Sequence, residues 1–299
     1  MEKIKSVPVQ GTIENMGEEN VRLPVVAGRF YAGSEDSLRE QIENCFTDPH
    51  GPGKIPKVEE GPRKIAGLVS PHAGYPYSGP VAAHGFSKLA SDGKPETVII
   101  VGPNHSGMGT NVSVDTSDFW KTPLGTVPVN KETRDEIVER SEVIELDSRA
   151  HSREHSIEVQ IPFLQYLFGD DFQIVPICMR TQNISASREI GEAIAKAIDE
   201  ETLIVASTDL THYESQKAAE EKDREAIEKM KGLDWEGLVK LVSEKSLSVC
   251  GYGPVASTIL ASKNAGAKKG ELFKYATSGD TAGPSNQVVG YCSLGIWKA

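Results

Sequence analysis

The sequence predicts an α/β protein of three layers, with a mostly parallel central sheet and helices on both faces. Short apolar runs typical of buried strands alternate with segments of helical periodicity, and no linker interrupts the alternation. A chain of 299 residues with 38% hydrophobic residues can bury a substantial core. We expect residues 1–22, which are polar, to form a flexible N-terminal extension and residues 23–299 to form a single α/β domain.

The individual elements follow from periodicity and from residues that begin helices. The first expected helix follows Ser34, a favourable N-cap, and carries Leu38, Ile42 and Phe46 on one stripe. A second begins at Pro80, because proline is favoured in the first helical position. Apolar runs predict strands at 65–70, 97–101, 111–114, 172–177, 203–207, 271–277 and 287–297, and periodicity predicts helices at 131–140, 154–168, 187–200, 215–230, 235–242 and from about 252.

Charge and composition exclude several classes of protein. The formal net charge of -11 disfavours nucleic acid and anionic membrane surfaces as partners. No run of about 18 apolar residues and no signal-peptide core occurs, so we expect a cytoplasmic protein without a membrane span. Three of the four cysteines, Cys45, Cys178 and Cys292, have the surroundings of small buried side chains, and no C-x-x-C pair is present.

Three histidines occupy the same topological position. His72, His105 and His212 each follow an apolar strand closely, in loops rich in Gly, Pro, Ser or Asn, whereas His50 and His84 do not. Ligands of open α/β sheets bind outside the carboxyl ends of the strands. We therefore expect these three histidines to share a functional site.

Cys250 is a candidate to join them. It lies in SVCGYGP, a glycine-rich turn before an expected helix, where a helix N-terminus would lower the thiol pKa. From its position alone, Cys250 could equally be a metal ligand or a buried structural cysteine. The neighbouring histidines favour the metal ligand. Two imidazoles and one thiolate suit a transition metal, with Fe(II) as the first expectation and Cu or Zn as alternatives.

A second cluster, HSREHSIEVQ, leaves two interpretations open. His151, Glu154 and His155 match H-x-x-E-H, the signature of inverted zinc peptidases, which requires both histidines on one helix face. Alternatively, Ser152 caps a helix with Glu154 in its first turn, and the cluster only lines a neighbouring site. No G-x-S-x-G elbow, phosphate-binding loop or G-x-G-x-x-G occurs, so neither a serine hydrolase nor a nucleotide cofactor is indicated.

Together the motifs resemble the Memo family, the Memo component of the AmmeMemoRadiSam set. The matching stretches are VAGRFYAGS, SPHAGYPYSGPVAAHGF, VGPNHSGMG, WKTPLG, HSREHSIEVQIPFL, STDLTHY, SVCGYGP and SGDTAG, nearly the whole chain. The resemblance implies a fold like that of the LigB-type class III extradiol dioxygenases, which bind non-haem Fe(II) at one sheet edge.

The resemblance also implies roles for single residues. His72 and His105 match metal-binding histidines, and Cys250 stands where the dioxygenases have a glutamate ligand. His212 matches the acid/base histidine, with Asp209 beside it, and His155 is similar to a site-lining residue. A thiolate in place of a carboxylate changes the potential of the iron and makes the sulfur oxidisable.

Two functions remain open. The first is metal-dependent redox or O2 chemistry on an unknown substrate, with His212 transferring protons, Asp209 fixing its tautomer, and Tyr75 and Glu154 lining the site. The second is a non-catalytic adaptor that binds a peptide or phosphopeptide in the same cleft. It would require a local basic patch, for which Arg29, Lys121, Arg149 and Arg153 are candidates. The family also suggests a functional link to a radical-SAM protein.

Overall fold

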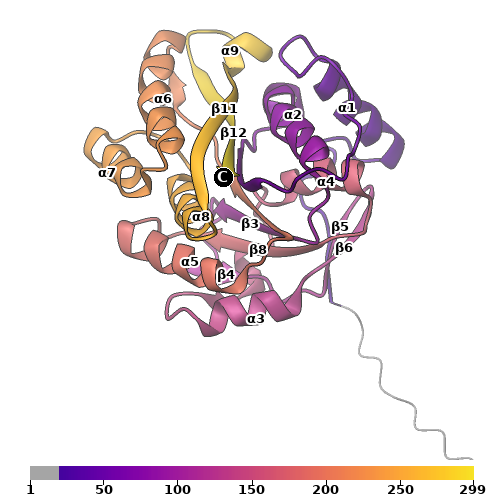
Figure 1. Cartoon of the computed structure of the whole chain (residues 1–299). Helices are drawn as coiled ribbons and strands as arrows, with labels where there is room; N and C mark the ends of the chain where they lie inside the picture. The colour runs from indigo at the N-terminus through magenta and orange to yellow at the C-terminus, as the bar shows by residue number, and fades with distance from the viewer. Residues whose placement is uncertain (1–19) are drawn as a thin grey trace, which may run out of the picture.

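The computed structural model describes residues 20–299, which form layers of helices around a large sheet (Figure 1). Within these residues the large sheet has nine strands in the order β10-β12-β2-β9-β3-β8-β4-β7, with β11 pairing to β12. Its strands are β2 (Ile65–Ser70), β3 (Thr97–Pro103), β4 (Val112–Val114), β7 (Glu145–Leu146), β8 (Gln173–Met179), β9 (Thr202–Ser207), β10 (His212–Glu214), β11 (Ala267–Thr277) and β12 (Val288–Lys298).

The sheet is parallel at its centre and mixed at its edges. Strands β2, β9, β3 and β8 are parallel neighbours, whereas β12 and β4 lie antiparallel on either side of them. The predicted α/β class is therefore confirmed, with antiparallel strands added outside the parallel core. A small second sheet joins β1 (Val21–Arg22), β5 (Phe119–Thr122) and β6 (Gly125–Pro128).

Helices cover both faces of the large sheet because both faces of its central strands are apolar. In β3, Val98 and Ile100 enter one hydrophobic cluster and Ile99 and Val101 enter another. The helices are α1 (Glu35–Thr47), α2 (Tyr75–Asp92), α3 (Lys131–Glu139), α4 (Ile161–Phe168), α5 (Ile184–Ala197), α6 (Gln216–Lys231), α7 (Trp235–Lys245), α8 (Tyr252–Asn264) and α9 (Ser278–Thr281), with short 3-10 turns at Ser148–Ala150 and Glu158–Gln160.

The two faces are covered by different helices (Figure 1). Leu38 and Phe46 of α1, Phe86 of α2 and Phe163 of α4 pack on the face that carries Ile100. The opposite face is covered by apolar side chains of α5, α6, α7 and α8. Burial of these side chains on two sides fixes the parallel strands, and hence the positions of the loops that follow them.

Several predicted boundaries were wrong, including the following three. Val21 and Arg22 already pair with β5, so the described fold begins before residue 23, and the expected flexible extension falls mainly on residues 1–19, outside the described part. Helix α2 begins at Tyr75 and contains Pro80, which was predicted to begin it. The helix expected over 154–168 begins with the turn at 158–160 and becomes α-helical at Ile161. No helix within residues 20–299 is long and apolar enough to cross a membrane.

Candidate metal centre

His72, His105 and Cys250 meet at one edge of the large sheet. His72 follows β2, His105 follows β3, and Cys250 precedes α8. Because β2 and β3 are both parallel to β9, which lies between them, their carboxyl ends open on the same side. One donor atom from each residue lies within 4.8 Å of the other two, and His72 Nε2 is 3.2 Å from Cys250 Sγ.

The hydrogen bonds of His72 determine which ring nitrogen faces the sulfur. Its Nδ1 lies 2.9 Å from Ser207 Oγ, and the Ser207 hydroxyl donates to the Ser156 carbonyl at 2.6 Å. Since the Ser207 hydroxyl proton is already donated, Ser207 Oγ accepts hydrogen bonds from His72 Nδ1–H and from Gln160 Nε2. His72 Nε2 therefore directs a lone pair toward Cys250. Burial lowers the pKa of His72, and so do the neighbouring His155 and His105 rings, which keeps it neutral.

Glu154 fixes His105 in the same way. The His105 backbone N–H donates to Glu154 Oε2 at 2.5 Å, and Nδ1 lies 3.0 Å from Oε1. Because a carboxylate can only accept a hydrogen bond, Nδ1 carries the proton, and the lone pair of Nε2 is left to bind a metal. Burial would lower the pKa of His105, but the hydrogen bond and charge of Glu154 raise it. Burial opposes ionisation of Glu154, yet contacts with His105, His155 and Ser156 N–H hold its pKa well below the usual range.

His155 adds a third imidazole beside the first two. Its ring stacks on His105 at a centroid distance of 4.7 Å, stands 5.4 Å from His72, and packs against Phe30 at 4.5 Å. Burial lowers its pKa to about 4 despite the charge of Glu154. His105, Glu154 and His155 thus form a second group of converging donors. The Glu154 oxygens already accept four N–H groups, so His72, His105 and Cys250 are the better set for a metal.

The Cys250 loop is held from two sides. Sγ accepts the Asp209 N–H at 3.1 Å, while Gln182 donates to the Cys250 carbonyl at 2.8 Å and accepts from Gly253 N. The expected lowering of the thiol pKa by the helix N-terminus was wrong. Burial raises the pKa of Cys250, and the charge of Asp209 raises it further. A metal would therefore displace the thiol proton on binding.

Asp209 and His212 lie nearby but do not orient each other. Asp209 Oδ1 accepts the His72 N–H at 2.8 Å, and burial raises the pKa of Asp209 to about 6. His212 Nδ1 lies 2.7 Å from the Leu210 carbonyl and 2.9 Å from the Ser248 carbonyl. Because a carbonyl can only accept a hydrogen bond, these two carbonyls place the proton on His212 Nδ1 and leave Nε2 free to accept a proton. Asp209 was expected to fix this tautomer and does not.

The zinc-peptidase interpretation of HSREHSIEVQ was wrong, because its two histidines diverge. Residues 151–157 form turns and not a helix, since the Glu154 carboxylate accepts the N–H groups of His155 and Ser156. His151 is buried elsewhere: its Nε2 lies 3.2 Å from the Ser113 carbonyl and its ring stands against Trp120. Ser152 caps no helix here.

A buried ion pair that the sequence analysis missed supports this segment. Arg22 Nη1 lies 2.6 Å from Glu158 Oε2, and its other nitrogens donate to the carbonyls of His151 and Glu154. Glu158 also accepts the hydroxyl of Tyr31 at 2.6 Å. These bonds connect the first described strand to the residues that orient His105. No pattern in the sequence marked Arg22 for this role. Of the residues that hold the His72 ring, Ser207 ends β9 and could have been suspected from that position, whereas Gln160 could not.

The aromatic side chains near the centre are not those predicted. Tyr75 is buried in the core, packs against Phe163, and donates its hydroxyl to the Val159 carbonyl, so the expected lining role was wrong. Tyr213 is exposed, with φ of 60° at an irregularity in the β10–β12 pairing, and stands beside His212. Tyr77, in the first turn of α2, and Met108, in the loop that carries His105, are exposed too. Bulges near functional sites commonly re-aim such side chains.

The chain matches known proteins over nearly its whole length. Residues 22–295 match the family model described as a Memo-like protein. The chain is 49% identical over 276 residues to a MEMO1 family protein of Methanopyrus kandleri, covering 91% of this chain and 98% of the relative. A MEMO1 family protein of Methanothermobacter thermautotrophicus is 47% identical over 277 residues, covering 92% and 99%.

A solved structure shares the fold. The crystal structure of an uncharacterized protein from Escherichia coli K12 matches with a TM-score of 0.53, covering 78% of this chain and all of that chain. At 16% identity, the similarity extends to the fold alone.

Proposed function

Because the chain belongs to the Memo family, we propose that it holds one transition-metal ion between His72, His105 and Cys250 and uses it in redox or O2-dependent chemistry. The observation that supports this proposal is the convergence of three donor atoms within 4.8 Å. In both histidines the hydrogen bonds at Nδ1 leave the Nε2 lone pair for a metal. We expect iron, with copper or zinc as alternatives.

The donor set fits such an ion. Imidazole suits iron, copper and zinc alike, and thiolate shifts the preference toward softer metals. Three protein ligands leave coordination positions open for a small molecule. When bound, iron would supply one-electron chemistry toward O2 or a small substrate.

The surrounding residues supply proton transfer and contact with the substrate. His212 offers Nε2 as a proton acceptor, because its Nδ1–H is held by two carbonyls. Asp209, whose pKa is raised to about 6 by burial, can carry a proton close to neutral pH beside the His72 backbone. Tyr77, Met108 and Tyr213 would form an apolar rim for the body of a substrate.

The adaptor function has weaker support. Of its four candidate cations, Arg149 is already paired with Asp147. Arg29, Lys121 and Arg153 are exposed and make no ion pair within residues 20–299, so a peptide phosphate could still engage them. A peptide ligand and the link to a radical-SAM protein remain proposals that follow from the family.

The test is anaerobic purification of the full chain, followed by metal quantification and reconstitution with Fe(II). We expect about one metal per chain and, with nitric oxide as a surrogate for O2, the electron paramagnetic resonance signal of an iron nitrosyl. His50→Ala, which removes a histidine outside the centre, is the control and should behave like the wild type. Failure of reduced protein to retain Fe, Cu or Zn would overturn the proposal, and phosphopeptide binding by that metal-free protein would favour the adaptor.

A further inference from the structure

The loop that carries Cys250 is tied to strand ends on both sides of β3. In the large sheet, β9 and β8 lie on either side of β3, the strand that His105 follows. After β9, the Thr208 hydroxyl accepts the Gly251 N–H at 2.9 Å. After β8, the Gln182 side chain bonds to the Cys250 carbonyl. The thiol is therefore held between two fixed points, close to the imidazole with which it would share a metal.

Gln182 uses both ends of its amide group in this contact. Its Nε2 donates to the Cys250 carbonyl at 2.8 Å, and its Oε1 accepts the Gly253 N–H at 2.8 Å. Gly253 lies in the first turn of α8, where backbone N–H groups have no partner within the helix. A carboxylate could not donate and an ammonium group could not accept, so the two bonds together require an amide. One side chain thus joins the carbonyl of Cys250 to the helix that follows it.

The shape of the contact depends on the glycine at position 253. A Cβ atom there would lie 2.7 Å from Cβ and 2.9 Å from Cγ of Gln182. Carbon atoms that are not bonded to each other prefer separations of about 3.5–4.0 Å, so any larger residue would push Gln182 aside. Glycine therefore allows the Gln182 side chain to lie against the start of α8, where it reaches both of its partners.

The position of the Cys250 loop sets the spacing of the donor atoms. Two donors that share one ion lie about 3–3.7 Å apart, because metal bonds to nitrogen and sulfur are about 2.0–2.3 Å long. His72 Nε2 and Cys250 Sγ are already 3.2 Å apart. The His72 ring is fixed by Ser207, so the rest of this spacing depends on the Cys250 backbone. If that backbone were free to move, restoring the spacing would cost part of the free energy of metal binding.

We propose that Gln182 is a positioning residue of the metal centre, which fixes Cys250 through its carbonyl and thereby raises the affinity for the ion. This inference rests on the proposed metal centre, to which Gln182 would contribute without being a ligand. Loss of a partner that orients a ligand typically lowers metal affinity about 10–100-fold. The alternative is that Gln182 only caps α8 through the Gly253 N–H, in which case metal affinity would not depend on the bond to Cys250.

Competition titration with Co(II) separates the two roles. Gln182→Leu removes both hydrogen bonds, whereas Gln182→Glu can still accept the Gly253 N–H but cannot donate to the Cys250 carbonyl. We expect both variants to bind Co(II) at least about tenfold more weakly than the wild type. At saturating Co(II), both should still show the sulfur-to-cobalt charge-transfer band, because Cys250 remains the ligand. If Gln182 only caps α8, Gln182→Glu should bind like the wild type, since a carboxylate is favourable at the start of a helix.

Gly253→Ala perturbs the same contact from the other side. Alanine is a better helix former than glycine, but its Cβ would displace Gln182, so Co(II) binding should again weaken about tenfold. Gln173→Leu, the same substitution at an exposed glutamine of β8, and Thr181→Glu, which adds the same charge one residue away, are the controls. Both should bind Co(II) within about twofold of the wild type.

The inference and the proposed function fail in different ways. If the wild type binds metal and Gln182→Glu binds it equally well, Gln182 is not a positioning residue and the proposed centre is unaffected. The same conclusion follows if Gln173→Leu weakens binding as much as Gln182→Leu, or if Gly253→Ala binds like the wild type. If the wild type retains no metal, the proposed function is overturned, and this inference with it.

Discussion

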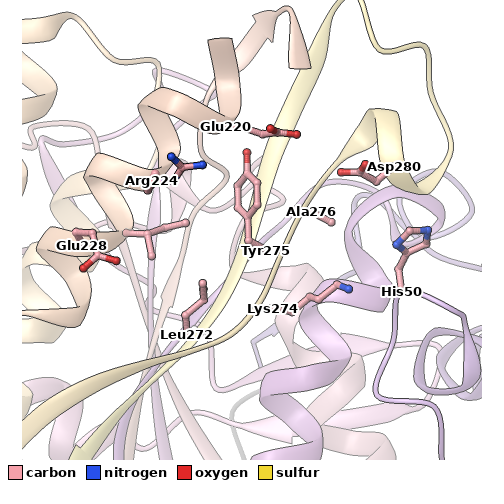
Figure 2. A pocket seen from close by; sticks show the side chains of 10 residues that line it. His50, Glu220, Arg224, Glu228, Leu272, Lys274, Tyr275, Ala276 and Asp280 are labelled. Atoms are coloured by element: carbon pink, nitrogen blue, oxygen red, sulfur yellow. The ribbon is translucent and has the colours of Figure 1, made fainter. Parts of the chain in front are cut away.

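The metal centre and the groove between α6 and β11 (Figure 2) differ in how their polar side chains are held. At the centre, each donor is oriented by a buried partner: His72 by Ser207, His105 by Glu154, and Cys250 by the Asp209 N–H. In the groove, the Arg224 and Lys274 side chains have no partner among residues 20–299. Fixed donors suit an ion that requires a defined coordination geometry, whereas side chains without fixed partners are not prearranged for one.

The largest effect should come from removing the imidazoles of the centre. His72→Ala/His105→Ala should lose stoichiometric metal, because two of three donors are gone. Arg224→Gln/Lys274→Gln, which removes two charges from the groove, should retain it. Metal analysis of anaerobically purified protein decides between these outcomes, and about one metal per chain in the histidine double variant would contradict the assignment.

The next effect concerns stability. Arg22→Met leaves Glu158 buried without its cation and should lower the free energy of unfolding by about 3–5 kcal/mol. Arg224→Gln changes an exposed residue and should alter it by no more than about 0.5 kcal/mol. Urea unfolding followed by circular dichroism measures both values. Equal stabilities would mean that the Arg22–Glu158 pair does not support the segment around the centre.

Glu154→Gln should have a smaller effect, confined to the centre. The variant keeps the shape of the side chain but loses the charge that orients His105, and metal affinity should fall about 10–100-fold. The pKa of His105 should fall as well, because Glu154 raises it. Metal competition assays and NMR titration of the imidazole test the two parts. An affinity within twofold of the wild type would show that Glu154 does not orient a ligand.

The smallest predicted effect is the pH dependence of metal affinity. The pKa of the Cys250 thiol is raised, so the thiol is protonated around neutral pH and metal binding must release that proton. Metal affinity should then rise about tenfold per pH unit in this range. At lower pH the slope should steepen, because His105, whose pKa is also raised, must lose a proton too. A flat profile around neutral pH would exclude the thiolate as a ligand.

The strand ends made the main residues of the centre predictable. Parallel strands bring their carboxyl ends to one edge, so His72 and His105 could be paired without knowing the fold in detail. Glu154 was predicted only to line the site, and neither its pairing with His105 nor that of Ser207 with His72 was predicted, since these contacts join segments far apart in the sequence. The i, i+4 spacing of His151 and His155 fits a helix equally well, and only the contacts of Glu154 show why a turn forms instead.

The antiparallel pairing of β11 with β12 could have been predicted from the length of the connection between them. The connection between β11 and β12 holds only α9 and a short loop, fewer residues than the dozen or more that a parallel crossover needs. By contrast, the start of α2 could not be decided from local sequence. Pro76 and Pro80 are equally suited to the first turn of a helix, and the helix begins at the earlier one. Local chemistry thus predicted the long helices and the central strands, but not the short strands such as β5 and β6, and tertiary contacts decided where the elements end.

The measurement that tests the central claim most directly is the absorption spectrum of the Co(II)-substituted protein and of its Cys250 variants. Wild-type protein should show a sulfur-to-cobalt charge-transfer band, because the thiolate binds the ion. Cys250→Ser should lose the band and most of the affinity. Cys250→Asp should lack the band yet recover part of the binding of Fe(II), since it restores a two-histidine, one-carboxylate set. If Cys250→Ser keeps the affinity and the spectrum of the wild type, Cys250 is not a ligand and the proposed centre is wrong.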